Sequence, residues 1–446
     1  MRRFLLWKVF AILGLALLLL IPLLLIEDKV RERNGRQREV EANIAESAAG
    51  AQQLVGPLLV VRYTETWKVE EKDEKTGKIS QRLESQEGHR VLVPKELRVG
   101  GEARIEERHR GLYKAQLYHL NARLTGRFHL PQAFGLKAEG KSVAVDGVHL
   151  VLGITDQRGI QSRPVLQWGG QAYDFAAGSD KDVLGRSIQA DLGSFEVREG
   201  RDVAFEIPLE LLGSQSLSIA PVADDTRVVL KSGWPSPSFG GRFLPVEHRI
   251  DGQGFEALWQ VSHLARDLGQ ILEPAREGLS GEVFQVTFVE PVNVYLMSER
   301  AVKYGILFVG LTFAAFFLFE VLKRLPIHPM QYLLVGMALA MFFLLLISLS
   351  EHLRFLWAYL VAGSAAVLLL GVYLSHVLGS RTRGMGFAAS LALLYGVLYG
   401  LLISEDNALL MGSILLFAAL GAVMLVTRKL DWYGLSSSRE PKPQEP

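Results

Sequence analysis

Three histidines are the first candidates for chemistry in this chain, because imidazole binds metal ions and transfers protons near neutral pH. His109, His119 and His129 recur every ten residues, with Glu106 and Glu107 nearby. Two metal ligands share a face when they lie two residues apart on a strand, or three to five apart on a helix. A spacing of ten matches neither period. We therefore interpret these histidines as surface or interior residues and predict no metal site.

Motifs of known enzymes are missing from the sequence. It has no nucleophile elbow, HExxH helix, phosphate-binding loop or dinucleotide fingerprint, and no cysteine to serve as nucleophile or thiolate ligand. Aspartates at 180–182 and 224–225 lie in turn-like sequence, where short carboxylates cap the backbone. A carboxylate pair for glycoside hydrolysis stays open, since the fold sets its separation. We predict no catalytic residue and no cofactor.

A stretch rich in proline and aromatic residues, WPSPSFGGRFLP, is a candidate binding loop. Its candidate residues are Trp234, Pro235, Pro237, Phe239 and Phe243. The prolines cannot donate backbone hydrogen bonds and hold the chain extended, whereas the following glycine pair permits a corner. Such a loop either recognises a ligand or closes the end of a β-sandwich. The structural interpretation is favoured.

Polar residues at the edges of apolar stretches form a second candidate set: Glu320, His328, Glu351 and His352. Glu320 lies one turn before the cations at 323–324, so we expect it to pair locally and to reach the membrane interface. Transporters usually place ionisable groups deep in the membrane or break helices there. The apolar stretches carry glycines that suit close helix packing but no central charge, which argues against transport.

Apolar stretches long enough to cross a bilayer dominate both ends of the chain. We predict spans at 9–26, 304–322, 332–349, 355–374, 387–403 and 408–426. The first is followed by Glu27-Asp28-Lys29 instead of a small-residue cleavage site, which favours a retained anchor over a signal peptide. The spans make the lipid bilayer the expected partner of the chain.

Basic residues predict the orientation of these spans, because lysine and arginine collect on the cytoplasmic side. One side of the predicted topology collects Arg2, Arg3, Lys8, Lys323, Arg324, Arg381, Arg383, Arg428 and Lys429. The short loops on the opposite side hold one basic residue, Arg354. Both termini are therefore expected in the cytoplasm, with residues 27–300 outside it. The net charge of +1 argues against a nucleic-acid partner.

The middle of the chain resembles a soluble β protein. Residues 27–50 predict a helix, and short β-type runs follow at 56–63, 89–94, 102–109, 148–154, 203–211, 216–221, 226–234 and 283–291. Expected turns lie at Gly100-Gly101, Asp146-Gly147, Gly169-Gly170, Gly213-Ser214 and Asp251-Gly252. This spacing is typical of an antiparallel β-sandwich. Whether it forms one sandwich or two stacked ones stays open.

The expected fold is thus an α+β membrane protein. We predict an N-terminal transmembrane anchor (1–26), a large antiparallel β-sandwich-like domain (27–300), a bundle of five transmembrane helices (301–430) and a cytoplasmic tail (431–446).

Several long stretches of the sequence are distinctive: WPSPSFGGRFLP followed by IDGQGFEALWQVSHLAR, and the segments 299–320, 327–336 and 345–355. Together they resemble the CreD family of bacterial inner-membrane proteins. The resemblance runs over nearly the whole chain. It implies an inner-membrane protein with a periplasmic domain, a gene controlled by a two-component system, and a role in cell-envelope integrity and tolerance of envelope stress. It supplies no catalytic residue.

Three functions follow as hypotheses. In the preferred one, the β domain binds an envelope protein, glycan or lipid without catalysis, and the helix bundle anchors it. In the second, the β domain is an enzyme acting on periplasmic glycan or lipid. The third, a transporter, has the least support.

Overall fold

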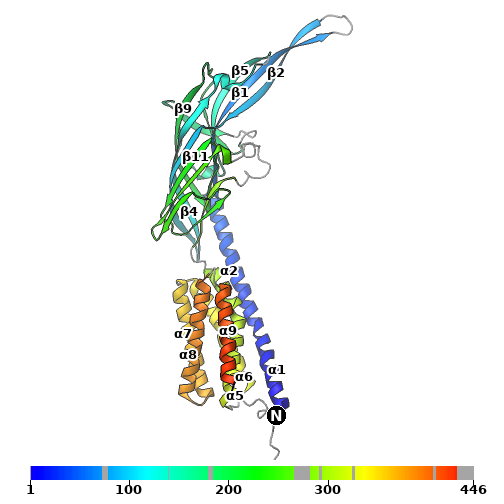
Figure 1. Cartoon of the computed structure of the whole chain (residues 1–446), viewed down its shortest axis with the longest axis vertical. Coiled ribbons are helices and arrows are strands. Elements are labelled where there is room, and N and C mark those ends of the chain that lie inside the picture. Colours follow the sequence, from blue (N-terminus) through cyan, green and yellow to red (C-terminus); the bar gives the residue numbers. More distant parts are fainter. Residues whose placement is uncertain are drawn as a thin grey trace, which may run out of the picture. The chain divides into compact units, whose positions relative to one another are not determined.

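The computed structural model of the chain describes residues 2–72, 79–138, 140–178, 184–265, 282–290, 294–323, 327–404 and 408–428. The chain divides into two compact units, Met1–Arg38 with Val292–Pro446, and Glu39–Pro291. The first is called the helical unit. The second contains all the described strands and is called the β unit (Figure 1).

Helices make up the described part of the helical unit, and most of them are long and apolar. They are α1 (Arg2–Leu18), α2 (Leu20–Ser47, whose last turns belong to the β unit), α4 (Val294–Lys303), α5 (Gly305–Lys323), α6 (Pro329–Ser350), α7 (Phe355–Val377), α8 (Arg381–Ile403) and α9 (Ala408–Thr427). Six described segments are long and apolar enough to cross a membrane: Trp7–Ser47, Gly305–Leu322, Pro329–Ser350, Phe355–Val377, Arg381–Ile403 and Leu410–Thr427. They match the six expected spans.

Two details of these helices follow from local sequence. α1 and α2 are separated at Leu19, because Pro22 has no N–H for the carbonyl of Leu18 and its ring crowds that carbonyl. α4 was not expected from the sequence. It is a short amphipathic helix that buries Tyr295 and Ala301, and its alternation of apolar and charged residues hides it from a search for long apolar runs.

The described residues of the β unit form fifteen strands, in the order β12-β15-β10-β1-β5-β8-β7-β6-β9-β4-β3-β11-β14-β13, with β2 beside β1. The first eight are β1 (Gln52–Lys72), β2 (Ile79–Leu92), β3 (Glu96–Arg110), β4 (Tyr113–Leu130), β5 (Ser142–Ile154), β6 (Val165–Trp168), β7 (Gln171–Gly178) and β8 (Ser187–Asp191). The rest are β9 (Arg201–Ser214), β10 (Ser216–Ile219), β11 (Asp225–Ser232), β12 (Pro237–Gly241), β13 (Glu247–Asp251), β14 (Gly254–Ser262) and β15 (Phe284–Phe288).

The sheet folds back on itself to make a sandwich. β7 pairs with β6 in one layer and with β8 in the other, so the two layers are continuous. Their inner faces meet through aromatic contacts such as Tyr118 of β4 with Phe288 of β15, at 5.1 Å between ring centroids. One cluster of buried apolar residues draws on strands of both layers. The described strands therefore form one sandwich, which resolves the alternative that the sequence left open.

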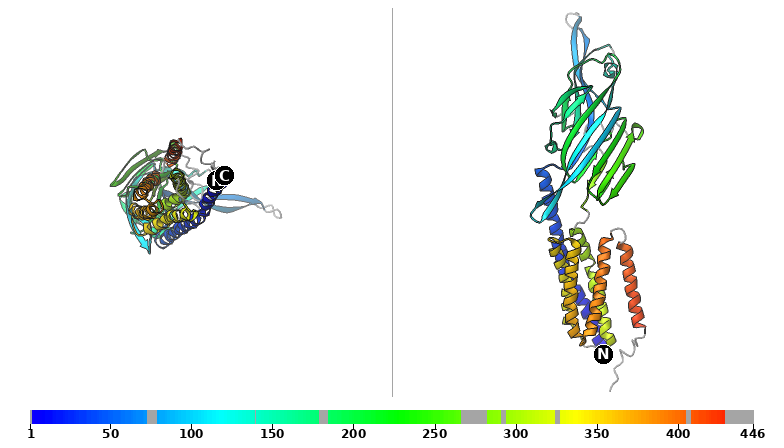
Figure 2. Two further views of the ribbon diagram at one scale, coloured as in Figure 1. Left: turned by 90° about the horizontal axis from the view of Figure 1, so that it is seen from below. Right: turned by 90° about the vertical axis from the view of Figure 1, so that its left-hand side faces the viewer.

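Most neighbouring strands are antiparallel, as expected, but β1 with β10 and β3 with β11 run parallel. The predicted strands all lie within or overlap observed ones. Of the predicted turns, Gly169-Gly170 and Asp251-Gly252 are turns, and Gly213-Ser214 ends β9 directly before a bend at Gln215, whereas the pairs at 100–101 and 146–147 lie inside β3 and β5. β1 and β2 form a long hairpin whose distal half projects beyond the other strands of the β unit (Figure 2).

The last turns of α2 pack on the sandwich. Ile44 and Ala49 contact a small apolar cluster formed with Leu117 of β4 and Leu212 of β9. These two leucines belong to the outer face of their layer, which is otherwise polar. The helix end therefore removes from water the part of this face that would otherwise expose apolar side chains.

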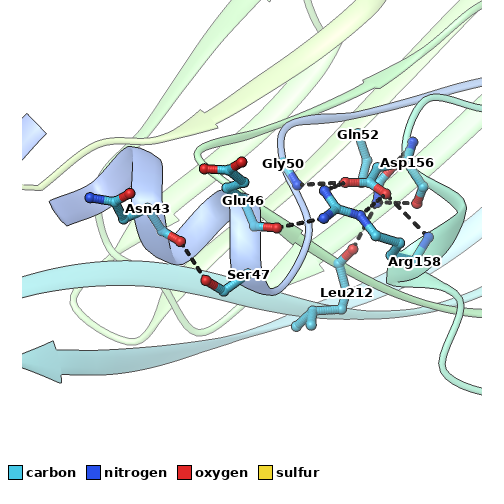
Figure 3. A network of polar contacts seen from close by, with 8 residues as sticks. All are labelled: Asn43, Glu46, Ser47, Gly50, Gln52, Asp156, Arg158 and Leu212. Atoms are coloured by element: carbon cyan, nitrogen blue, oxygen red, sulfur yellow. Dashed lines mark hydrogen bonds and ion pairs between the residues drawn. The ribbon is translucent and has the colours of Figure 1, made fainter. Parts of the chain in front are cut away.

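A polar clamp fixes the chain just after α2 (Figure 3). Arg158 donates to both oxygens of Asp156, at 2.9 Å from Nε and 2.7 Å from Nη2, and also donates to the carbonyl of Glu46 at the end of the helix. The backbone N–H of Gly50 donates to the same carboxylate. These hydrogen bonds, the one from Arg158 above all, lower the pKa of Asp156 to about 2.

Gly159 makes this arrangement possible. Gln52 donates from Nε2 to the carbonyls of Asp156 and Leu212, both at 2.9 Å (Figure 3). A Cβ on Gly159 would lie 2.2 Å from the Leu212 carbonyl oxygen and 2.4 Å from Gln52 Nε2. A side chain at this position would displace the hydrogen bonds that join the segment to β9, so the close approach requires glycine.

Candidate binding face of the sandwich

A polar groove of about 920 Å³ lies on the outer face of β3, β4 and β9. It is bounded by residues of those strands and by Gln161, which follows the clamp: Gly100, Gly101, Glu102, Arg104, Ile105, Glu106, His119, Leu120, Asn121, Gln161, Glu210 and Leu211. Its volume is that of a site for a small ligand or for part of a polymer.

Strand register places three polar side chains of the groove in one row. Glu102 of β3 is opposite Asn121 of β4, and Asn121 is opposite Glu210 of β9. Residues opposite each other in a sheet point to the same face, and all three are exposed. The row therefore presents two carboxylates and a central amide, which together can accept and donate hydrogen bonds.

Glycine at position 100 leaves the floor of the groove open. A Cβ added to Gly100 would meet no atom within 4 Å, whereas one added to Gly101 would contact Leu120 and Leu230 on the core side. Gly100 thus leaves a hollow on the outer face, where Arg98 and Glu102 on either side of it in β3 carry long side chains. We predicted a turn here, and that prediction is wrong because the pair sits in the middle of a regular strand.

One end of the groove carries an ionic pair. His119 Nε2 and Glu106 Oε2 share a hydrogen bond of 2.7 Å, and Arg108 donates to the other oxygen of Glu106 at 2.9 Å. The contact with His119, followed by that with Arg108, lowers the pKa of the Glu106 carboxyl. This carboxylate is held charged and already has partners.

The three histidines do not form one site. His119 and His129 both lie on β4, ten residues apart. His129 Nδ1 lies 2.7 Å from Asp202 Oδ1, and this hydrogen bond lowers the pKa of the Asp202 carboxyl. His109 lies on β3 and is exposed. In the described part of the chain, no three His, Asp or Glu side chains are arranged to hold a metal ion.

The predicted binding loop lies away from the groove. Pro237 begins β12, which pairs with β15. Trp234 donates from Nε1 to the carbonyl of Val289 at 2.9 Å, while Phe239 and Phe243 pack against the core. Phe239 meets Trp259 edge-on at 5.6 Å. The aromatic rings of the predicted loop thus contribute to one end of the sandwich core. Pro235 links Trp234 to β12.

Glu320 is buried inside the helical unit. One carboxylate oxygen accepts from Lys8 of α1, the other accepts from the hydroxyl of Tyr332 of α6 at 2.7 Å, and Lys8 also donates to the carbonyl of Ile327. Glu320 is 7% exposed, so its carboxylate is enclosed by protein and finds its described partners on other helices. The expected partners at 323–324 lie outside the described side chains.

The other membrane-edge residues either make local structural contacts or lie exposed. His328 caps α6: its Nδ1 accepts from the N–H of Met330, and its own N–H donates to Gln331. Glu351 pairs with Arg33 of α2 at 3.4 Å. His352 lies exposed in the turn after α6.

Comparison with known proteins assigns the chain to a family. A profile of the family described as "Inner membrane protein CreD" matches residues 4–433. The chain belongs to the CreD family. Inner membrane protein CreD of Escherichia coli (strain K12) is 36% identical over 432 residues, which are 96% of this chain and 94% of that protein. The CreD assignment confirms the resemblance found in the sequence and makes this a homologue of an inner-membrane protein.

Among solved structures, the chain is similar to the M1 zinc metallopeptidase from Deinococcus radiodurans and to a point mutant of that enzyme bound to a Tyr-Ser-Ala substrate. Each is 9% identical, and the match covers 44% of this chain and 42% of the other, with TM-scores of 0.22 and 0.21. These scores are too low to carry an argument about this CreD-family protein.

Proposed function

We propose that this CreD-family chain is a multi-pass inner-membrane protein whose β unit lies in the periplasm and binds a hydroxyl-rich glycan of the envelope. Both termini lie in the cytoplasm and residues 27–300 in the periplasm. The chain binds this envelope component without catalysing a reaction on it, and binding contributes to envelope integrity.

The polar groove is the observation that carries the proposal. Its row of Glu102, Asn121 and Glu210, with the amide of Gln161 beside it, combines hydrogen-bond acceptors and donors on an open face. Sugar hydroxyls both donate and accept, so they can satisfy such a row in a way that an apolar ligand cannot. The hollow above Gly100 provides space for a ring.

Calorimetry on the full-length protein in a sugar-free polyoxyethylene detergent tests the binding. Chitotetraose, a neutral oligosaccharide, is the probe, and Asn121→Ala is the test variant. Gln260→Ala is the matched control, because it removes an amide from the same outer face on β14. We expect Asn121→Ala to weaken binding about tenfold, since the amide makes about one or two hydrogen bonds to the sugar.

Equal affinities for Asn121→Ala and Gln260→Ala, or no binding by the native chain, would contradict the proposal. The envelope role is tested in a strain lacking the gene. There, Gln260→Ala restores resistance to envelope stress and Asn121→Ala does not.

Thiol labelling tests the topology, because the chain has no native cysteine. Gln171→Cys lies on an exposed strand of the β unit, and Thr382→Cys on the exposed first turn of α8. A membrane-impermeant maleimide added to intact cells should label the first and not the second. The opposite pattern would place the β unit in the cytoplasm and end the proposal.

Hydrolysis of an envelope glycan is a second candidate function, favoured by the positions of Glu102 and Glu210. They flank Asn121 from opposite sides, and strands spaced about 4.8 Å apart set their backbones about 10 Å apart. Carboxyl groups about 6.5–9.5 Å apart are typical of inverting glycosidases. Release of new reducing ends from glycan, abolished by Glu102→Gln or Glu210→Gln, would favour the enzyme over the binding protein.

A further inference from the structure

A cluster of arginines lies beside the groove on the same outer face. Arg98 of β3, Arg123 of β4 and Arg227 of β11 surround a hollow of about 370 Å³, which has Gly100, Thr125 and Val229 at its base. Gly100 also borders the groove, so the two depressions adjoin at this residue.

Strand register brings these cations together. Arg227 is directly opposite Arg98 in the parallel pair of β11 and β3. Arg123 is opposite Gly100, one diagonal step from Arg98. Like charges directly opposite each other in a sheet destabilise it. The fold therefore keeps an arrangement that costs stability in the absence of an anion.

Neighbouring carboxylates neutralise only part of this charge. Glu96 accepts from both Arg98 and Arg127, and Glu206 accepts from Arg123 at 2.7 Å. Three arginines thus share two carboxylates. Arg227 forms no ion pair with any described residue and faces the hollow, where Gly100 leaves room for a group of several atoms.

We propose that this arginine hollow binds the phosphate of a phosphorylated saccharide whose sugar lies in the adjoining groove. The guanidinium fork matches the oxygens of a phosphate, and two or three arginines around one hollow can neutralise its two charges. The assignment rests on the proposed function, because it names the chemical class of the ligand that the groove takes. The hydroxyl of Thr125 supplies a further donor to the phosphate.

Three probes separate the sugar from the charge in calorimetry on the full-length protein in polyoxyethylene detergent: N-acetylglucosamine 1-phosphate, N-acetylglucosamine and inorganic phosphate. The native chain should bind the sugar phosphate at least tenfold more tightly than the neutral sugar. That preference should decrease as salt is raised, because the contact is ionic.

Arg227→Gln is the test variant. It removes the guanidinium that has no carboxylate partner among the described residues and relieves the repulsion with Arg98, so its melting temperature should equal or exceed that of the native chain. It should bind the sugar phosphate at least tenfold more weakly and the neutral sugar unchanged. Arg249→Gln, which removes an exposed arginine from β13, is the charge-matched control and should change neither affinity.

The outcomes distinguish the two proposals. Binding of the neutral sugar with no preference for the phosphorylated one overturns the arginine site and leaves the proposed function standing. Arg227-dependent binding of both phosphate probes, without binding of the neutral sugar, supports the arginine site and overturns the glycan groove. Equal loss in Arg227→Gln and Arg249→Gln shows a general effect of charge and overturns the arginine site.

Discussion

The two units of the chain treat charged side chains in opposite ways. In the helical unit, Glu320 is buried and both of its oxygens are occupied, by Lys8 and by Tyr332. In the β unit, Glu102 and Glu210 face an open groove, and neither forms an ion pair with a described residue. Glu320 is used internally, whereas Glu102 and Glu210 stay available.

Solvent explains the difference. A charge in a low-dielectric interior must be paired and hydrogen-bonded, because removing it from water costs several kcal/mol. A charge on an open sheet face keeps its water until a ligand replaces that water. The buried, fully partnered Glu320 is therefore evidence of packing, whereas the exposed Glu102 and Glu210 are evidence of binding, and substitutions should separate these two roles.

The largest effect on stability is expected in the helical unit. Lys8→Met or Glu320→Gln should destabilise the protein by about 3–5 kcal/mol, because each leaves a buried polar partner unpaired. Reversible unfolding in mixed detergent measures the change. The double variant Lys8→Met with Glu320→Leu should recover most of the loss, and Tyr332→Phe should cost about 1 kcal/mol. Additive losses in the double variant would show that the pair does not act as a unit.

A smaller loss is expected where α2 joins the sandwich. Gly159→Ala should destabilise the β unit by about 1–3 kcal/mol, because its methyl group would overlap the Leu212 carbonyl and the Gln52 amide. Thermal unfolding of the full chain measures this. Gly252→Ala is the control, since it lies in an exposed turn without a positive φ and with no atom within 4 Å of the added Cβ. Equal losses would remove the argument from close approach.

The clamp should weaken in acid. The pKa of Asp156 is lowered to about 2, below the ordinary value of an aspartate of about 3.9, so its stabilisation is complete above about pH 4 and declines as the pH falls towards 2. A spin label at Glu46→Cys should be immobile at pH 7 and become mobile as the pH approaches about 2.

Asp156→Asn should release the same label at neutral pH, with a loss of about 1–2 kcal/mol after allowing for solvent screening. Asp225→Asn, at an exposed strand end, is the control. A label that stays immobile in Asp156→Asn would mean that the apolar contacts of Ile44 and Ala49 hold the helix end alone.

A substitution in the groove should have the smallest effect on stability and the largest effect on binding. Gly100→Val adds a side chain to open space in a strand, so stability should stay unchanged or rise by about 0.5–1 kcal/mol. Binding of chitotetraose should be lost, because the valine fills the floor. Unfolding and calorimetry on one preparation measure both. A destabilised Gly100→Val variant would show that the glycine serves packing instead.

The sequence predicted the apolar helices and eight of the fifteen described strands, because these have strong periodic signals. It missed β4, although its alternation of Leu120, Ala122 and Leu124 with polar residues is regular, and also β6, β7, β8, β12, β13 and β14. It also missed the groove, because Glu102 and Glu210 are far apart in sequence and meet only through strand order. The glycine pair inside the alternating run of β3 was the available signal, since glycine within a strand often marks a hollow or a close approach.

The other contacts that the sequence did not predict join residues far apart in the chain. Lys8 and Glu320 are 312 residues apart, so local spacing favoured the neighbouring cations instead. The clamp between Asp156, Arg158 and the end of α2 has the same origin. Its local part, an aspartate two residues before an arginine, is common on surfaces and carries no sign of the helix that it holds.

One short segment, 156–161, serves both the clamp and the groove. Asp156 and Arg158 hold the end of α2, and Gln161 borders the groove. Occupancy of the groove and attachment of the helix are therefore thermodynamically linked wherever a ligand shifts Gln161. If a bound ligand strengthens the attachment of α2 by a given free energy, the attached helix strengthens binding of that ligand by the same free energy. A ligand that weakens the attachment is bound more weakly by the same amount when the helix is attached.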